Sequence, residues 1–195
     1  MFTGIVSGVG QIIHVSPLQD GVHIRVACGS WPIALVQIGD SIMHQGVCLT
    51  VVYKQDEVLG YDVSAHTLAL TVGLDKVGEV NLEKSLTLAD VLGGHMVSGH
   101  VDGLGVVIDV QAKAESHVLR VSAPADLAKF IARKGSIAVN GVSLTVNAVE
   151  GTIFEVNLIP HTWLVTTLHH LSVGDKVNLE VDPIARYVER LLQFS

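Results

Sequence analysis

The sequence predicts an all-β protein made of two tandem, similar small barrels with one helix at the C-terminal end. Three observations support this fold class. The 195-residue chain repeats itself at an offset of 95 residues. Each copy is a series of short apolar or alternating runs divided by turn residues, which is the pattern of strands. An apolar stripe at helical spacing follows the second copy alone.

The repeat sets the predicted domain organisation. Residues 1–71 align without a gap with residues 96–166 and share 19 identical pairs, whereas this composition would give roughly five by chance. SIMHQGVCLTV at 41–51, for example, lies on SIAVNGVSLTV at 136–146. The predicted units are a first barrel at 1–92, a second barrel at 93–183 and a helical tail at 184–195.

Each copy contains five or six predicted strands. Gly, Asp and Asn residues and a Pro-Leu-Gln-Asp turn separate the runs, and valine is abundant within them. So many short strands in about 90 residues predict a closed or nearly closed barrel, since closure removes exposed strand edges. In the first copy the runs are GIVSGVGQIIHV, GVHIRVAC, DSIMHQGVCLTVV, VLGYDVS and EVNLE.

Helical signals are few. Residues 124–132 begin with proline and place their apolar side chains on one face, and residues 31–36 are the counterpart in the first copy. The tail at 183–192 carries a longer apolar stripe. Because the tail has no counterpart after the first copy, two interpretations stay open: it packs on its own barrel, or it joins an oligomer.

Charge and composition exclude several classes of protein. There are 12 Lys and Arg against 19 Asp and Glu, a net charge of −7, with no basic run, so nucleic acid and anionic membranes are poor partners. Polar residues interrupt the uncharged stretches at 1–19 and 156–174, which excludes a membrane span. The chain has no basic residue before Arg25 and only two cysteines, Cys28 and Cys48. We expect a soluble cytoplasmic protein.

Common cofactor and metal motifs are absent. GVGQII at 8–13 lacks the third glycine of a dinucleotide fingerprint. Ten histidines, among them His95, His100, His169 and His170, show no standard ligand spacing, so we predict no metal site.

Matched positions of the two copies carry different polar groups. Cys48 matches Ser143, and Ile5 matches His100. This pattern suits two similar ligands that are treated differently, although divergence after duplication also produces it. Cys48 is either a thiol nucleophile paired with a distant histidine or a small buried hydrophobe.

Several motifs together resemble the riboflavin synthase family of the duplicated, alpha-chain type. They occur in the family's order over essentially the whole chain. The motifs are MFTGIV at the start, GVCLTV at 46–51, GGHMVSGHVDG at 93–103, KGSIAVNGVSLTVN at 134–147, LIPHT at 158–162 and VNLEVDPIARYVERLL at 177–192. The resemblance implies two six-stranded Greek-key lumazine-binding barrels and a homotrimer assembled through the C-terminal helix.

The resemblance also implies an activity in riboflavin biosynthesis. Such a transferase moves a four-carbon unit between two molecules of 6,7-dimethyl-8-ribityllumazine, giving riboflavin and 5-amino-6-(D-ribitylamino)uracil without a metal or redox cofactor. Each site would form between the first barrel of one subunit and the second barrel of its neighbour. An association with lumazine synthase occurs in parts of the family. The same fold also serves non-catalytic antenna proteins that bind lumazine or flavin, and a barrel without a ligand is a third alternative.

The site residues are carried over by position. Substrate contacts in the first half-site would come from Gly4, Ile5, Val6, Cys48, Leu49, Thr50, Asp62, Val63, Ser64, Ala65, His66 and Thr67. Those in the second half-site would come from Gly99, His100, Val101, Lys134, Ser143, Leu144, Thr145, Asn157, Leu158, Ile159, Pro160, His161 and Thr162.

Four of the family positions would carry the chemistry. His100 is the acid-base candidate, because an ordinary histidine pKa of about 6.5 permits both roles near neutrality. Cys48 and Ser143 would act as nucleophile or hold water, and Asp182 would polarise Ser143. The residue types leave open which group is the base and which the nucleophile. Two residues depart from the family near the first half-site: Gln45 replaces asparagine, and His66 replaces an acid. The presence of Cys48, His100 and Ser143 favours the enzyme over the antenna protein.

Overall fold

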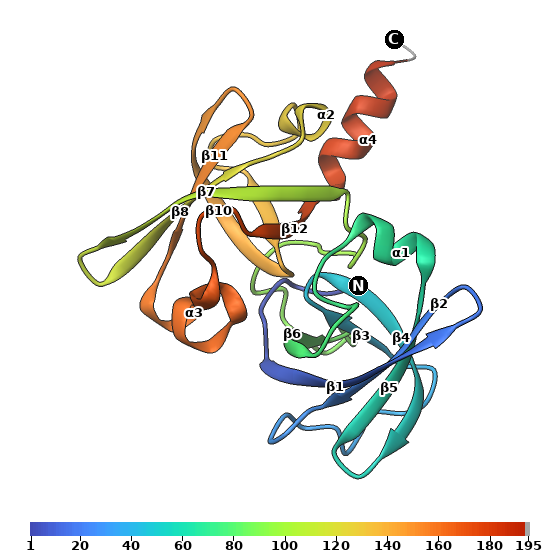
Figure 1. Ribbon diagram of the computed structural model, residues 1–195. Coiled ribbons are helices and arrows are strands. Elements are labelled where there is room, and N and C mark those ends of the chain that lie inside the picture. Colours follow the sequence, from blue (N-terminus) through green and yellow to red (C-terminus); the bar gives the residue numbers. More distant parts are fainter. Residues whose placement is uncertain (194–195) are drawn as a thin grey trace.

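The protein forms two closed, antiparallel, six-stranded β-barrels, which confirms the predicted fold class (Figure 1). The structure is a computed structural model that describes residues 1–193; Phe194 and Ser195, the last two residues of the predicted tail, lie outside the described residues. In the first barrel β2 (Gly21–Ala27) pairs with β5 (Val58–Ser64) rather than with β3 (Ser41–His44), which is the crossing of a Greek key.

The strands follow one another in the same order in both barrels. The first barrel contains β1 (Gly8–Leu18), β2 (Gly21–Ala27), β3 (Ser41–His44), β4 (Val47–Gln55), β5 (Val58–Ser64) and β6 (Gly78–Lys84). The second contains β7 (Gly103–Lys113), β8 (Ser116–Ser122), β9 (Ser136–Val139), β10 (Val142–Glu150), β11 (Ile153–Leu158) and β12 (Lys176–Val181).

The offset of 95 residues is preserved in the strands. β1 to β5 begin 95 residues before β7 to β11, and the register shift between Ile12 and His14 recurs between Val107 and Asp109. A bulge bends a strand and increases its twist, which helps a short sheet to close. The repeated sequence therefore encodes the curvature of the barrel as well as its strands.

Alternation along β4 separates the barrel interior from its outer face. Val47, Leu49 and Val51 are buried in the core of the first barrel, whereas Cys48 is half-buried and Thr50 is exposed on the outer face. This is the period of two that a strand imposes on its side chains. The polar groups of the repeated G-V-[CS]-L-T-V motif consequently lie outside the barrel, where a ligand can reach them.

Short helices follow the fifth strand of each barrel. α1 (Ala65–Leu70) and α3 (Pro160–Val165) are matched in the repeat, and a 3-10 helix, η1 (Thr167–His170), follows α3. None of the three was predicted from the sequence, because each is less than two turns long. α2 (Ala125–Ala128) is shorter than the predicted segment at 124–132.

The helix predicted at 31–36 is wrong, since this segment is irregular apart from one turn at 34–35. The Lys54 ammonium donates to the carbonyls of Ile33 and Val36 at 2.8 and 2.7 Å. Trp31, Ile33 and Val36 are all buried against the barrel core. The lysine therefore takes the carbonyls that a helix would use, while the apolar side chains close one end of the barrel.

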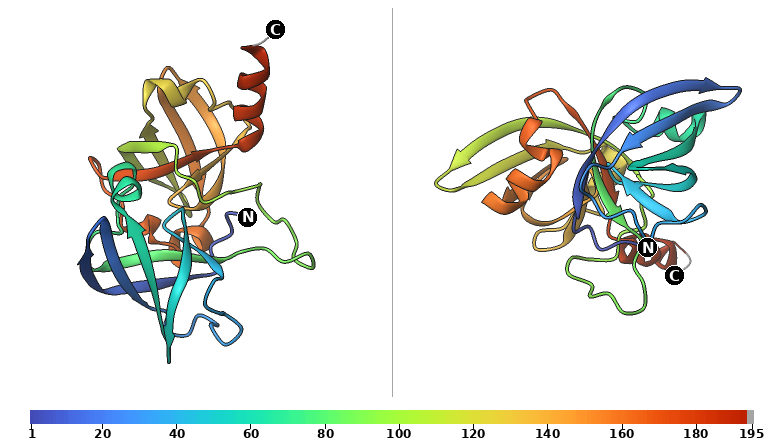
Figure 2. Two further views of the ribbon diagram at one scale, coloured as in Figure 1. Left: turned by 90° about the vertical axis from the view of Figure 1, so that its right-hand side faces the viewer. Right: turned by 90° about the horizontal axis from the view of Figure 1, so that it is seen from below.

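The C-terminal helix, α4 (Pro183–Leu192), projects beyond the barrels (Figures 1 and 2). Asp182 caps it by accepting from Ile184 N at 3.0 Å. None of its residues is buried, and Tyr187 and Leu192 are 73% and 70% exposed. The apolar stripe of the tail is thus left uncovered by its own chain. No helix in the described part of the chain is both long and apolar enough to cross a membrane.

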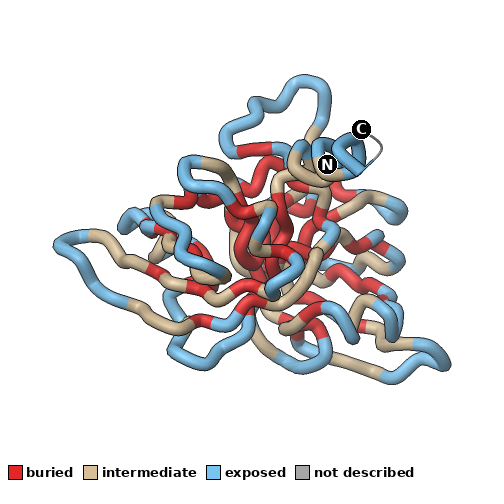
Figure 3. The backbone as a smooth tube through the Cα atoms, turned by 90° about the horizontal axis from the view of Figure 1, so that it is seen from above, coloured by how far each residue is buried: buried red, intermediate tan, exposed pale blue. Residues whose placement is uncertain are grey.

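The chain segments that precede the two barrels pair with each other at the centre of the molecule. Phe2 N donates to the Val97 carbonyl at 2.7 Å, and Val97 N donates to the Phe2 carbonyl at 3.1 Å. Both side chains are fully buried together with Met43 and Ala138. Figure 3 shows buried residues concentrated in this central region, while the hairpin ends are exposed.

A buried amide network completes the contact between the barrels. Asn81 Nδ2 donates to the Asn140 carbonyl at 2.9 Å, and Asn178 Nδ2 donates to the Gln45 carbonyl at 2.8 Å. Gln45 Oε1 accepts from Asn81 N and from Thr167 Oγ1, at 2.9 and 3.1 Å. Gln45 therefore belongs to the barrel contact, not to the first half-site, and its longer side chain serves these bonds.

Candidate functional site

Each barrel is crossed by the segment that leads into the other barrel. Cys48 N, on β4 of the first barrel, donates to the Gly99 carbonyl at 2.8 Å. Ser143 N, on β10 of the second barrel, donates to the Gly4 carbonyl at 2.8 Å. Each predicted nucleophile position therefore lies beside the matched glycine from the start of the other copy.

This exchange corrects the grouping of the predicted site residues. Val6 packs against the core of the second barrel, and Val101 packs against the core of the first. The segment 4–6 consequently joins the Ser143 half-site, and the segment 99–101 joins the Cys48 half-site. The alignment of the two copies could not show which segment crosses which barrel, because the two leading segments resemble each other.

Glycine is required where the leading segments cross the strands. Gly4 and Gly99 have φ of +74° and +78°. A Cβ atom on Gly4 would lie 2.5 Å from the Ser143 Cβ, and one on Gly99 would lie 2.6 Å from the Cys48 Cβ. Any larger residue would suffer both backbone strain and a clash.

Two buried glutamates hold the leading segments in place. Glu83, at the end of β6, accepts from Thr3 N and Gly4 N at 2.6 and 3.0 Å. Glu180, on β12, accepts from Gly99 N and His100 N at 2.9 and 3.0 Å. Burial raises the pKa of both carboxyl groups, and these backbone hydrogen bonds oppose the rise. Sequence reasoning missed the pair, although the matched acid at the end of the repeated V-N-L-E run is its signal.

Ser143 has a partner that the sequence analysis did not assign. His95 Nδ1 lies 2.7 Å from Ser143 Oγ, and the histidine is 8% exposed. Burial lowers the pKa of His95, and the nearby charge of Asp182 opposes this shift. His95 is thus the hydrogen-bonding partner of Ser143, and the charge of Asp182 acts on His95. That Asp182 also polarises Ser143 stays a prediction.

A cavity of about 740 Å³ opens beside Ser143 on the outer face of the second barrel. Its volume suits a ligand of the size of a substituted heterocycle. Six predicted residues line it: Ser143, Leu144, Thr145, Asn157, Ile159 and Thr162. The lining also includes Lys113, Ala114, Ser116, Val118, Asn147 and Glu155, which were not predicted.

Strand alternation is the signal that could have found two of the missed residues. Asn147 lies two positions beyond Thr145 on β10, and Glu155 lies two positions before Asn157 on β11. Side chains two apart share a face of the sheet, so both point to the cavity side. Ser116 Oγ donates to Asn157 Oδ1 at 2.9 Å and thereby orients that amide.

The first half-site is more exposed. The His100 side chain is exposed, while its backbone is fixed because its carbonyl accepts from the Arg186 guanidinium at 3.1 Å. The Asp62 carboxylate lies 2.6 Å from His23 Nδ1. Ser64 Oγ accepts from Thr67 N at 3.1 Å and caps α1, so these two residues also have a structural role.

The comparisons with known proteins agree with this duplicated geometry. A model of the lumazine binding domain matches the chain twice, over residues 3–85 and 98–182. Riboflavin synthases of Photobacterium phosphoreum and Brucella abortus (strain 2308) are 43% and 42% identical to this chain. The alignments cover 98% and 100% of this chain, and 89% and 100% of the relatives. The chain belongs to the riboflavin synthase family.

Solved structures similar to this member of the riboflavin synthase family include two ligand complexes of LumP. The complex with riboflavin has a TM-score of 0.84, and the complex with 6,7-dimethyl-8-(1'-D-ribityl) lumazine has a TM-score of 0.81. Both are 25% identical to this chain and cover 93% of it and 99% of their own chain. The resemblance predicted from the sequence motifs is confirmed.

Not every residue assigned from the riboflavin synthase family can meet a ligand through its side chain. Leu49, Val63, Leu144 and Leu158 are buried in the barrel cores, so only their backbone groups are available. Lys134 is exposed in a turn with φ of +67° and does not line the cavity. Further exposed positions outside the cavity are Ile5, Ala65, His66, Pro160 and His161.

Proposed function

We propose that the protein is a riboflavin synthase that converts two molecules of 6,7-dimethyl-8-ribityllumazine into riboflavin and 5-amino-6-(D-ribitylamino)uracil by transfer of a four-carbon unit. One observation carries this proposal: the chain has two matched half-sites, each a polar strand face crossed by a leading segment of the other barrel. A duplicated site suits a reaction between two copies of one substrate.

The cavity beside Ser143 supports binding of one of the two substrates. Hydroxyl and amide groups of Thr145, Asn147 and Asn157 line it and can bond the polar edge of a pyrimidinedione ring. The second substrate would bind beside Cys48 and His100 on the first barrel. Aligning two bulky reactants in this way supplies much of the catalytic gain, because their relative motion is already restricted.

We assign the proton transfers to the histidines of the two half-sites. The reaction removes a proton from the C7 methyl group of one lumazine and adds a nucleophile at C7 of the other. Neutral His95 is placed to take the proton of Ser143 or of a water that this hydroxyl holds, and Asp182 stabilises the resulting imidazolium. His100 is exposed where it can exchange a proton with the other substrate. Cys48 remains the matched nucleophile position of the first half-site.

We further propose that α4 assembles the protein as a homotrimer. Ile184, Tyr187 and Val188 are 58%, 73% and 49% exposed on a helix none of whose described residues is buried. Burying this stripe between copies would bring the first barrel of one subunit against the second barrel of its neighbour and complete the site. The proposed units are 1–92, 93–183 and a tail at 184–195 that carries the oligomerisation helix. We also propose a cytoplasmic location and an association with lumazine synthase of the kind that occurs in parts of the family; both proposals rest on the family resemblance alone.

A turnover assay separates this proposal from the antenna alternative. The protein is incubated with 6,7-dimethyl-8-ribityllumazine without any added cofactor, and riboflavin is followed by its absorbance. We expect riboflavin to accumulate. Binding of lumazine without turnover would establish an antenna protein instead, and the absence of binding would remove both ligand-based functions.

A further inference from the structure

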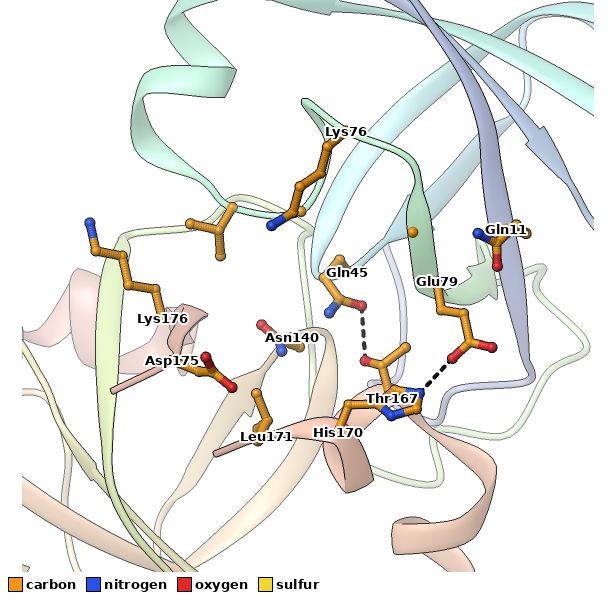
Figure 4. Close-up of a pocket in the computed structure, with 13 residues that line it drawn as sticks. Gln11, Gln45, Lys76, Glu79, Asn140, Thr167, His170, Leu171, Asp175 and Lys176 are labelled. Carbon is orange, nitrogen blue, oxygen red and sulfur yellow. Dashed lines mark hydrogen bonds and ion pairs between the residues drawn. The ribbon is translucent and has the colours of Figure 1, made fainter. Parts of the chain in front are cut away.

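A second cavity, of about 750 Å³, lies between the two barrels and shares no lining residue with the proposed half-sites (Figure 4). Its wall is contributed by both barrels, with Gln11 and Glu79 from the first and His170, Asp175 and Lys176 from the second. The proposed reaction uses none of these residues.

Three potential metal ligands gather at the edge of this cavity. Glu79, His169 and His170 each offer one ligand atom, and these atoms all lie within 4.8 Å of one another. Glu79 Oε2 is 2.7 Å from His170 Nε2, and Figure 4 shows the two side chains pointing toward each other. The rings of His169 and His170 lie 3.9 Å apart between their centroids.

The backbone orients His169 for metal binding. His169 Nδ1 lies 2.6 Å from the Thr166 carbonyl oxygen. Because a carbonyl oxygen can only accept, Nδ1 carries the hydrogen and Nε2 keeps its lone pair. A metal-bound histidine usually donates its other ring N–H to an oxygen atom in this way, which fixes both the tautomer and the ring orientation.

We propose that Glu79, His169 and His170 bind a divalent transition metal of the Zn²⁺ class, and that the ion links β6 of the first barrel to η1 of the second. Two imidazoles and one carboxylate are ligands that such ions prefer, and three protein ligands leave one position for water. In a tetrahedral site with bonds of about 2.0–2.1 Å, ligand atoms lie about 3.3 Å apart. Rotation of the exposed Glu79 and His170 side chains can bring the ligand atoms to this spacing while His169 keeps its hydrogen bond to Thr166.

No metal site was predicted from the sequence, because that prediction depends on ligands at short spacing along the chain. His170 and Glu79 are 91 residues apart and meet only when the two barrels pack together. The site is structural and goes beyond the proposed function, so its presence does not depend on the lumazine reaction. An ordinary ion pair between His170 and Glu79 is the competing explanation, and it does not require His169.

The proposal is tested by titrating the full chain with Zn²⁺ and measuring the binding by isothermal titration calorimetry. We expect one equivalent of Zn²⁺ to bind to the wild type, and His169→Ala and Glu79→Gln each to weaken binding by about tenfold or more. His14→Ala removes another exposed histidine outside the cluster and should bind Zn²⁺ as the wild type does. Far-UV circular dichroism verifies that all variants are folded.

The thermal unfolding midpoint provides an independent measurement. An ion that binds only the folded chain raises this midpoint, so Zn²⁺ should stabilise the wild type and His14→Ala but not His169→Ala. Mg²⁺, which prefers oxygen ligands, should have no such effect. Wild-type Zn²⁺ affinity in His169→Ala, or no saturable binding in the micromolar range, would overturn the proposal.

Discussion

His95 Nδ1 lies 2.7 Å from Ser143 Oγ, although His95 precedes the second copy of the repeat and the two residues are 48 positions apart. His95 follows the two glycines of the G-G-H motif in the segment between the barrels. This segment therefore supplies the hydrogen-bonding partner of a hydroxyl on β10. Its burial, with 8% exposure, keeps water from competing for that bond.

Replacing His95 by glutamine should slow turnover by about 10²-fold with a smaller change in KM, because glutamine can hold Ser143 but cannot take its proton. Burial lowers the pKa of His95, so wild-type activity that depends on neutral His95 should be retained above the ordinary value of 6.5 and fall only at lower pH. His95→Gln should lack this acidic limb. The profile of kcat against pH is measured for both proteins. The same profile in the wild type and in His95→Gln would show that His95 does not titrate in the reaction.

Replacing His100 by alanine should slow turnover far more than it weakens lumazine binding. The imidazole is exposed while the backbone is held by Glu180 and Arg186, so truncation removes the acid-base group and leaves the loop in place. We expect a loss of about 10²-fold in kcat, measured beside the Kd for lumazine by fluorescence titration. A wild-type rate would remove His100 from the mechanism.

Introducing charge on α4 should dissociate the proposed trimer. Val188→Glu places a carboxylate on the uncovered apolar stripe, where burial against another copy would be unfavourable. We expect a folded monomer by analytical ultracentrifugation with less than about a tenth of the wild-type activity, because each half-site then lacks its neighbour. Val173→Glu, at an exposed valine in the turn before β12, is the matched control. Deleting 184–195 should act likewise, whereas an active monomer would contradict the site between subunits.

The first barrel should lose stability in acid because of one buried histidine. Burial lowers the pKa of His44 to about 3, while in the unfolded chain this pKa has its ordinary value of 6.5. The unfolded state therefore binds more protons between these values, and the free energy of unfolding should fall as the pH decreases from about 6.5 toward 3. Urea unfolding at several pH values measures this slope.

The repeat offers a matched control for that measurement. Val139 occupies the position of His44 in the second barrel, and His44→Val should reduce the dependence on acid. Glu83 and Glu180 act in the opposite sense, because burial raises the pKa of each carboxyl group. Their contribution to the free energy of unfolding is present below the ordinary pKa of 4.5 and decreases as the pH rises above it. An identical acid slope in wild type and His44→Val would contradict the assignment to His44.

Local periodicity accounts for the parts of the fold that were predicted correctly. Alternation along β4 and β10 places Cys48 and Ser143 on outer faces, and the offset of 95 residues identifies them as equivalent. The helix α4 was predicted in the same way, from apolar residues at helical spacing. The incorrect helix at 31–36 shows the limit of such patterns, since a distant lysine, Lys54, takes the carbonyls of that segment.

The sequence by itself determined the two barrels, the terminal helix, the family and six of the residues that line the cavity beside Ser143, because these follow from patterns within short stretches, from the repeat and from the family motifs. Only the tertiary structure decided that Gly4 lies on the second barrel and Gly99 on the first, and that His95, not Asp182, bonds Ser143. The physical reason is the duplication: both leading segments are similar and both barrels present similar strands, so the local sequence does not distinguish the two pairings. Packing of the barrels around Phe2 and Val97 selects one of them.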